Sequence, residues 1–284
     1  MDFRLGCAIW SYKDWIGEFF PVGSRAIDFL QLYSRRLTAV EANTTFYSIP
    51  EADTVQRWVT ETPDGFHFCP KLPRTITHAG LLTPTLSETL AFLERMQALH
   101  PRLGPFFAQL PPTYGPSYID DLTTFLAAFP RHDRALALEV RHPDWFQEPH
   151  ATELNTRLQQ LDVGRVLLDT RPIYDSPDDP QQYSQRRKPQ VPLQPIVTAR
   201  FSLIRYISHP DLNQNQPYLH QWVTQVQQWL QAGIQLYFFV HCPNEQQSPT
   251  IARHFQRLLE QHDVPVPSLP WDAIEEPPTQ LSLF

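Results

Sequence analysis

The sequence has 284 residues, of which 42% are hydrophobic and 19% are charged, so the chain can bury a sizeable core and its composition argues against global disorder. Its 23 basic and 30 acidic residues give a net charge of −7, which argues against nucleic-acid binding over the whole surface but not against a local basic site. Three isolated cysteines, no signal-like N-terminus and no apolar run near the roughly 18 residues of a membrane span lead us to expect a cytoplasmic protein without disulfides.

Short apolar segments alternate with amphipathic segments along the chain. The amphipathic segments carry apolar residues three and four apart, as in Trp222 and Val226 and again in Ile251 and Phe255, which is typical of helices that pack on a core. Eight apolar segments predict strands: Phe3–Ile9, Thr38–Ala42, Gly65–Lys71, Gly104–Leu110, Ala135–Arg141, Val163–Asp169, Ser202–Ile207 and Gln235–Val240. This alternation predicts an α/β fold, a single (β/α)8 TIM-type barrel, with a doubly wound open sheet as the alternative.

The sixth strand–helix repeat and the C-terminal segment depart from this alternation of apolar and amphipathic segments. Pro172–Pro195 is rich in Pro, Gln and Arg and predicts a long loop. The helical pattern stops near Asp263, and the remaining residues are Pro-rich and acidic. We therefore expect a barrel domain over residues 1–263 and an extended tail over residues 264–284.

Polar residues gather where the predicted strands end, which is where barrels place their chemistry. Three pairs are separated by two positions, so the members of each pair share one strand face: Glu41 and Asn43, Glu139 and Arg141, Asp169 and Arg171. If these faces point inward, the three carboxylates meet a set of basic side chains: Lys71, Arg141, Arg171, Arg205 and His241.

This predicted cluster has two interpretations, an ion network that plugs the barrel and a ligand site. Four lysine and arginine side chains against three carboxylates make the mouth locally positive. That balance favours an anionic ligand such as a phosphate or carboxylate, because arginine forks match those oxygens. Basic neighbours would lower the pKa of a carboxyl group and burial would raise it, and the sequence leaves the direction open.

We prefer the ligand site. Carboxylates beside a lysine are candidates for general acid–base catalysis, and the aromatic residues either stack on a sugar or base or anchor loops. The candidate catalytic residues are Glu41, Lys71, Glu139 and Asp169. The candidate ligand-binding residues are Trp10, Asn43, Tyr47, His78, Gln109, Arg141, Trp145, Arg171, Arg205 and His241.

Motifs for cofactors are sparse. The nine glycines form neither a G-x-G-x-x-G nor a Walker loop, which argues against a dinucleotide cofactor. The sequence contains no HExxH or G-x-S-x-G motif, and Cys7, Cys69 and Cys242 lie in apolar segments that predict core positions. A divalent metal could be held only by side chains that the fold brings together, so its presence stays open.

The strand-end segments, taken in order, resemble the YecE-like family, known as domain of unknown function 72. They are GCAIWSYKDWIGEFFP, AVEANTTFYSIP, FHFCPKLPRTITH, QLPPTYGP, LEVRHPDWF, LLDTRP, IRYISHP and YFFVHCP, within roughly Phe3 to Leu259. The resemblance implies a TIM-type barrel and supplies no reaction, because the activity of the family is unestablished. The matching positions are Trp10, Glu41, Asn43, Thr45, Tyr47, Lys71, Thr77, His78, Gln109, Glu139, Arg141, Trp145, Asp169, Arg171, Arg205 and His241. Ser208 stands where the family usually has glycine, so the loop after the seventh strand is expected to differ.

The last five residues, QLSLF, resemble the pentapeptide that bacterial polymerases and repair proteins insert into the sliding clamp. Gln280 can hydrogen-bond at a pocket rim, while Leu281, Leu283 and Phe284 can bury apolar surface after a flexible linker. Docking of this segment on the protein's own barrel is the alternative, and we prefer the clamp.

Three functions are compatible with these features. The first, which we favour, is a barrel hydrolase that acts on nucleic acid or a nucleotide product and is recruited by the clamp. The second is a metabolic enzyme, of isomerase or hydrolase type, on a small anionic sugar. The third is a non-catalytic binding protein. The substrate and the reaction are not deducible at this point.

Overall fold

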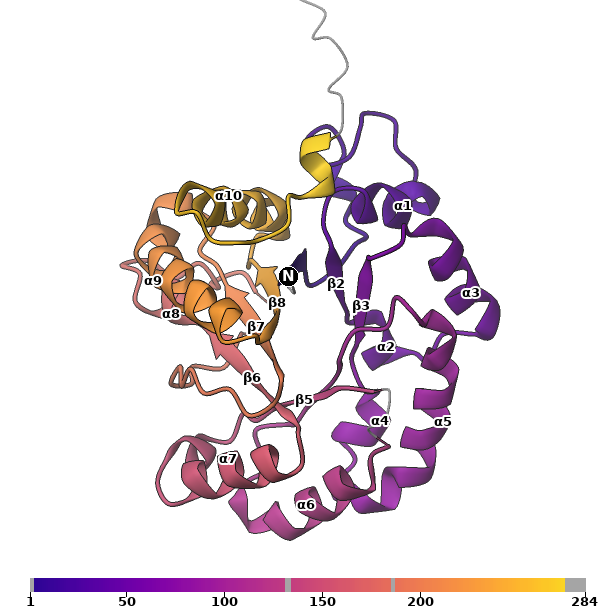
Figure 1. Ribbon diagram of the computed structural model, residues 1–284, viewed down its shortest axis with the longest axis vertical. Helices are drawn as coiled ribbons and strands as arrows, with labels where there is room; N and C mark the ends of the chain where they lie inside the picture. Colours follow the sequence, from indigo (N-terminus) through magenta and orange to yellow (C-terminus); the bar gives the residue numbers. More distant parts are fainter. Residues whose placement is uncertain (1–2, 131–133, 185–186, 274–284) are drawn as a thin grey trace, which may run out of the picture.

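The computed structural model describes residues 3–130, 134–184 and 187–273, and its centre is a barrel of eight parallel strands (Figure 1). The strands are β1 (Phe3–Cys7), β2 (Ala39–Ala42), β3 (His67–Pro70), β4 (Phe106–Gln109), β5 (Leu136–Glu139), β6 (Gly164–Asp169), β7 (Phe201–Ile207) and β8 (Gln235–His241). β1 pairs with both β2 and β8, which continues the sheet around the barrel. The predicted (β/α)8 barrel is confirmed, and the open-sheet alternative is wrong.

The barrel closes between β3 and β4 through a looser seam than its other strand pairs. Lys71, directly after β3, forms an isolated parallel bridge with Phe107 of β4. The Leu72 N–H donates to the Phe107 carbonyl at 2.9 Å. Lys71 is therefore held at the seam, at the carboxyl end of the strands.

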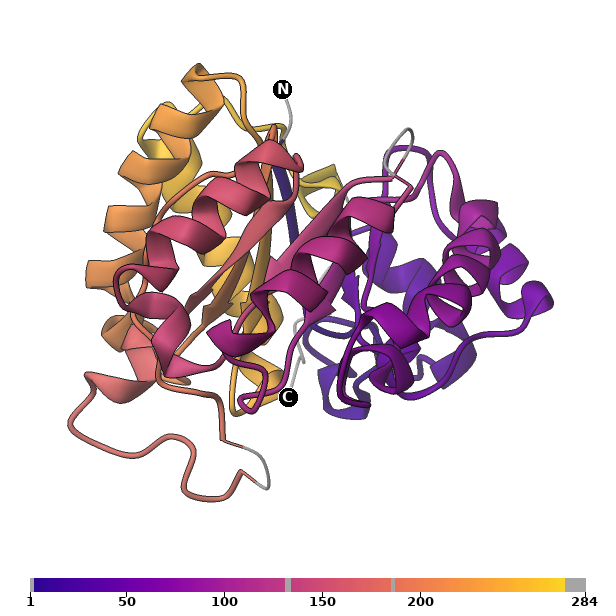
Figure 2. The same cartoon turned by 90° about the horizontal axis from the view of Figure 1, so that it is seen from below.

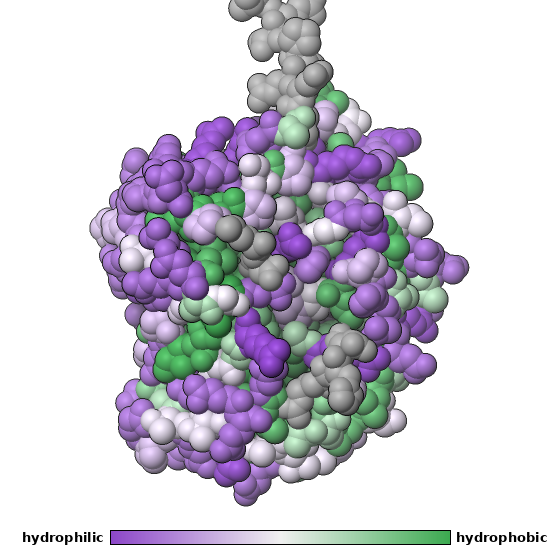
Figure 3. Space-filling model, in the orientation of Figure 1, coloured by the Kyte–Doolittle hydropathy of each residue, from purple (hydrophilic) through white to green (hydrophobic). Residues whose placement is uncertain are grey.

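Helices surround the strands because each presents an apolar stripe to them. The described residues form α1 (Phe29–Ser34), α2 (Thr44–Tyr47), α3 (Ala52–Glu61), α4 (Arg74–Thr77), α5 (Leu86–Met96), α6 (Ile119–Ala128), α7 (His150–Gln160), α8 (Arg171–Tyr174), α9 (Leu212–Gln231) and α10 (Ser248–Gln261). The predicted stripes are confirmed, since Trp222 and Val226 on α9 and Ile251 and Phe255 on α10 are buried. Much of the outer surface over the helices is hydrophilic (Figure 3).

The side chains inside the barrel form layers of different chemistry. An apolar layer contains Ala39, Cys69, Phe107, Ala137, Leu203 and Phe239. Two positions further along each strand come buried polar residues: Glu41, Lys71, Gln109, Glu139, Arg205 and His241. Because strand side chains alternate with a period of two, both sets point inward. The barrel therefore has an apolar plug covered by a polar layer.

The predicted long loop of the sixth repeat is present between α8 and β7. It projects beyond the strands at one end of the barrel (Figure 2). The Tyr174 hydroxyl donates to the Lys188 carbonyl at 2.5 Å, and the Lys188 N–H donates to Gln181 Oε1 at 2.7 Å. These two bonds fix the backbone at Lys188.

The first part of the predicted tail packs on the barrel. Val264 and Leu269 are buried, and the Trp271 N–H donates to the Arg36 carbonyl at 3.3 Å. The clamp-like residues Gln280, Leu281, Leu283 and Phe284 lie outside the described residues. Among the residues that are described, no helix has the length and apolar character needed to cross a membrane.

Candidate functional site

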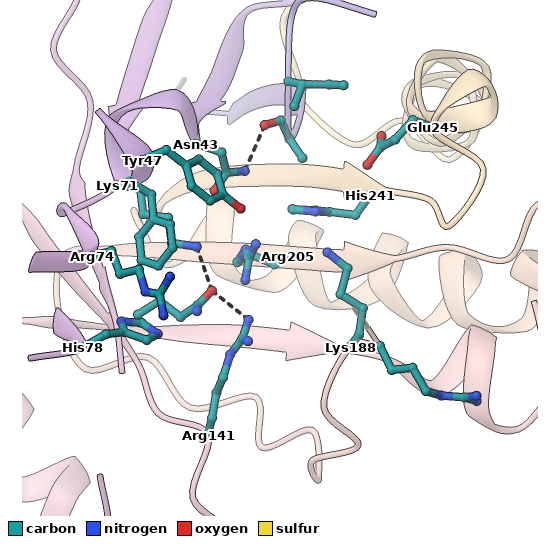
Figure 4. Close-up of a pocket in the computed structure, with 15 residues that line it drawn as sticks. Asn43, Tyr47, Lys71, Arg74, His78, Arg141, Lys188, Arg205, His241 and Glu245 are labelled. Carbon is teal, nitrogen blue, oxygen red and sulfur yellow. Dashed lines mark hydrogen bonds between the residues drawn. The ribbon is translucent and has the colours of Figure 1, made fainter. Parts of the chain in front are cut away.

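A cavity of about 530 Å³ lies at the carboxyl ends of the strands (Figure 4). Eight of the predicted site residues line it: Asn43, Tyr47, Lys71, His78, Gln109, Arg141, Arg205 and His241. Glu41 and Glu139 lie beneath it, bound to Arg205. The fold thus brings together most of the residues that the strand ends suggested.

Arg205 on β7 binds both buried carboxylates at the base of the cavity. Its Nε and Nη2 each donate to a Glu41 carboxylate oxygen at 2.8 Å, and its Nη1 donates to Glu139 Oε2. Burial raises the pKa of each carboxyl group, but the Arg205 guanidinium outweighs it. The pKa of Glu41 lies well below its usual value and that of Glu139 is lowered to about 2. Both groups are therefore ionised at neutral pH.

Asn43 and His241 occupy the remaining hydrogen-bonding positions of Glu41. Asn43 Nδ2 donates to Glu41 Oε1 at 2.6 Å, and His241 Nε2 lies 2.9 Å from Glu41 Oε2. Burial lowers the pKa of His241 to about 4 despite the neighbouring carboxylate, so the ring is neutral and donates through Nε2–H. A carboxylate with four such donors is positioned to hold Arg205 in place rather than to accept a proton.

Lys71 and Arg141 meet at Gln109 on β4. Gln109 Oε1 accepts from Lys71 Nζ at 2.8 Å and from Arg141 Nη2 at 2.7 Å. Lys71 Nζ also lies 4.2 Å from the centre of the Phe46 ring. Burial, together with the charge of Arg205, lowers the pKa of Lys71 to about 7. A neutral amine is therefore well populated at neutral pH, which is unusual for lysine.

Several residues of the cavity were not among the candidate ligand-binding residues. Arg74 and Phe46 lie in the short helices after β3 and β2, Lys188 comes from the long loop, and Glu245 follows β8. Burial raises the pKa of Glu245 to about 7, and Ser248 Oγ donates to its Oε2 at 2.9 Å. Lys188 follows two arginines in the sequence of the long loop, and these three basic residues in succession were a signal for it. The other three residues lie outside the strands and carry no periodic signal.

The structure does not bring Asp169 and Arg171 into this cluster. Asp169 pairs in register with Tyr206, the neighbour of Arg205, so it points to the opposite side of the sheet. There it accepts from Arg171 Nε and Nη2 and from Trp222 Nε1 of α9, each at 2.8 Å. The expectation that three carboxylates converge is therefore corrected to two.

Two of the predicted aromatic contacts are loop anchors. Trp145 is buried and donates through Nε1 to the Tyr114 carbonyl at 2.8 Å. Trp10 packs edge-on against Trp58, with the ring centres 5.1 Å apart. Tyr47, in contrast, is 68% exposed at the cavity wall. Tyr47 alone of these three aromatic side chains is placed to contact a ligand.

Two further features concern the loops and metal binding. Ser208 Oγ donates to the His241 carbonyl at 2.8 Å, so the serine ties the ends of β7 and β8 together. Within the described ranges, no three His, Cys, Asp or Glu side chains are grouped closely enough to hold a metal ion.

Comparison with known proteins gives the family. The family described as "Protein of unknown function DUF72" matches residues 4–274. The chain belongs to the DUF72 family. It is 35% identical to the UPF0759 protein YecE of Escherichia coli K12 over 283 residues, which covers 99% of both chains. It is 28% identical to the UPF0759 protein YunF of Bacillus subtilis over 151 residues, covering 51% of this chain and 52% of that protein.

Solved structures of DUF72 proteins have the same fold. A DUF72 family protein from Enterococcus faecalis superposes with a TM-score of 0.69 at 20% identity, covering 91% of this chain and 95% of the other. A DUF72 family protein from Thermotoga maritima gives a TM-score of 0.67 at 20% identity, covering 92% and 100%. At this identity the likeness concerns the barrel, and the function must be argued from the site.

Proposed function

We propose that this DUF72 protein is an enzyme that binds a small phosphate-bearing or other anionic ligand in the strand-end cavity. The observation that carries the proposal is the excess of positive charge around one cavity in an acidic protein. Arg74, Arg141 and Lys188 line it, whereas the two carboxylates beneath it are already bound to Arg205 and burial raises the pKa of Glu245 in its wall to about 7. Guanidinium and ammonium groups match phosphate oxygens in charge and geometry.

Two of these cations are available to a ligand. Among the described residues, neither the Arg74 guanidinium nor the Lys188 amine forms a hydrogen bond or a close ion pair, although both line the cavity and Lys188 feels the charge of Glu245. Arg141 is held by Glu139 and Gln109 and is therefore oriented before a ligand arrives. Catalysis is supported by a buried amine with a shifted pKa at the end of a barrel where catalytic groups gather.

The test is calorimetric titration of the full chain with inorganic phosphate and ribose 5-phosphate, with ribose as the uncharged comparison. We expect both phosphate compounds to bind and ribose not to bind. Arg74→Gln and Lys188→Gln should each weaken phosphate binding about tenfold, because each removes a charge-assisted hydrogen bond. The matched variant Arg57→Gln removes the same charge from the exposed side of α3 and should leave Kd unchanged. Absence of phosphate binding contradicts the proposal.

The sequence QLSLF favours a second candidate, in which the anionic ligand is part of a nucleic acid or a nucleotide product. In this case the tail recruits the barrel to a bacterial sliding clamp. Titration of the clamp with the full chain and with a Gln280→Ala/Phe284→Ala variant tests it. Micromolar binding that the variant loses supports recruitment, and equal behaviour of the two proteins removes this candidate.

A further inference from the structure

Lysine is rare in this chain, and two of its three copies lie at the cavity. The sequence contains 20 arginines but only Lys13, Lys71 and Lys188. Lys13 is exposed in a short helical turn after β1, while Lys71 and Lys188 both line the cavity. Arginine stays protonated in proteins, and only lysine can offer a neutral amine. A chain that uses arginine nearly everywhere thus has lysine where an amine could react.

The surroundings of Lys71 favour the neutral amine. Its side chain is 6% exposed, and Nζ lies 4.2 Å from the Phe46 ring centre and 5.3 Å from that of Phe107. Its hydrogen bond to Gln109 Oε1 uses one N–H and leaves the rest of the amine toward the cavity (Figure 4). Removal from water and the nearby Arg205 charge both disfavour the ammonium form, as in lysines that act as nucleophiles.

His78 is a neutral base at the same cavity wall. Its ring packs edge-on against Phe46, 5.1 Å between ring centres, and its Nδ1 lies 2.8 Å from Thr77 Oγ1. Burial and the nearby charges of Lys71 and Arg141 lower the pKa of His78 to about 4. The imidazole therefore carries no charge at neutral pH and can accept a proton and pass it on.

We propose that Lys71 is an amine nucleophile that forms an imine with the carbonyl carbon of a phosphate-bearing aldehyde or ketone. The proposal rests on the proposed function, because the cationic side chains Arg74, Arg141 and Lys188 hold the phosphate while the carbonyl reaches Lys71. The long loop has a role in this arrangement, since the bonds from Tyr174 and Gln181 fix the backbone of Lys188.

The reaction balances without a further co-reactant. The neutral amine of Lys71, the carbonyl compound and one proton from solvent give an iminium and one water: the C=N bond forms, the C=O bond breaks, and the leaving oxygen receives one proton from nitrogen and the one from solvent. His78 carries these protons. Nothing is oxidised or reduced. The iminium withdraws electrons from the adjacent carbon, which prepares it for proton abstraction or for cleavage of a carbon–carbon bond.

The test is reductive trapping on the full chain. The protein is incubated with dihydroxyacetone phosphate or glyceraldehyde 3-phosphate, reduced with borohydride and mapped by peptide mass spectrometry. Dihydroxyacetone, which lacks only the phosphate, is the matched comparison. We expect a mass increase on Lys71 equal to the probe less one oxygen atom, at least about tenfold faster than on Lys13. The label should be slower with dihydroxyacetone and suppressed by excess inorganic phosphate.

The comparison of Lys71 with Lys13 takes place inside one chain, so it does not depend on the folding of a variant. Lys71→Arg keeps the charge and should abolish the fast label, whereas Lys13→Arg should retain it. Labelling of Lys71 no faster than of Lys13 by both phosphorylated probes overturns the imine proposal. If inorganic phosphate still binds by calorimetry, the proposed function survives that result; if phosphate does not bind, both fail.

Discussion

Arg205 and Glu41, which are 164 positions apart in the sequence, form a two-point ion pair with both N···O distances at 2.8 Å beneath the cavity. The pair connects β7 with β2 across the inside of the barrel. Glu139 of β5 completes it, so one guanidinium joins three strands. Since these charges are almost completely buried, each depends on its partners.

Replacement of Arg205 tests this network. Arg205→Met leaves two buried carboxylates without their main partner and should lower the free energy of unfolding by about 3–5 kcal/mol, measured by urea denaturation. Arg57→Met breaks only the partly exposed pair with Glu61 on α3 and should cost at most about 1 kcal/mol. Similar losses in the two variants would show that the buried network adds nothing to stability.

The buried amine of Lys71 should make stability depend on pH. Its pKa is lowered to about 7 in the folded chain, while an unfolded lysine titrates near 10.4. Between these values the unfolded state holds a proton that the folded state lacks, so stability rises with pH. Relative to Lys71→Met, the wild type should gain up to about 1.4 kcal/mol per pH unit from pH 7 to 9. Urea denaturation at three pH values gives the dependence of the free energy of unfolding on pH for each protein. Equal slopes for the wild type and Lys71→Met would show that the pKa of Lys71 is not lowered.

Asp169 should contribute to stability and not to ligand binding. Asp169→Asn weakens its bonds to Arg171 and Trp222 on the helix side of the sheet, and should lower the free energy of unfolding by about 1–3 kcal/mol. The Kd for inorganic phosphate should not change. A variant that is as stable as the wild type but no longer binds phosphate would place Asp169 in the site.

The long loop should act through the placement of Lys188. Tyr174→Phe removes the hydroxyl that donates to the Lys188 carbonyl and should weaken phosphate binding about fivefold, which corresponds to about 1 kcal/mol. Tyr183 lies in the same loop and is 91% exposed, so Tyr183→Phe is the matched control and should bind normally. Equal affinities of the two variants for phosphate would show that the bond from Tyr174 to the loop plays no part in ligand binding.

The strand ends were predictable because their signal is local. Each of the eight strands is a short apolar run, and each site residue near a strand end breaks that run at its carboxyl end. The spacing of two also placed Glu41 with Asn43 and Glu139 with Arg141. The spacing does not show which of the two faces of a strand points into the barrel, because that depends on register and on closure of the barrel. Asp169 has the same local pattern as Glu139 and lies on the other side of the sheet.

By itself, the sequence determined the barrel, its eight strands and the list of polar residues at their ends. Apolar periodicity and polarity at strand ends depend only on residues that are close together in the sequence. Only the tertiary structure decided which of those residues meet. Burial beside Arg205 produced the shifted pKa of Lys71, and a loop between α8 and β7 delivered Lys188 to a cavity built by other strands. Charge, desolvation and distance between residues far apart in the chain are properties of the folded molecule, so no local pattern records them.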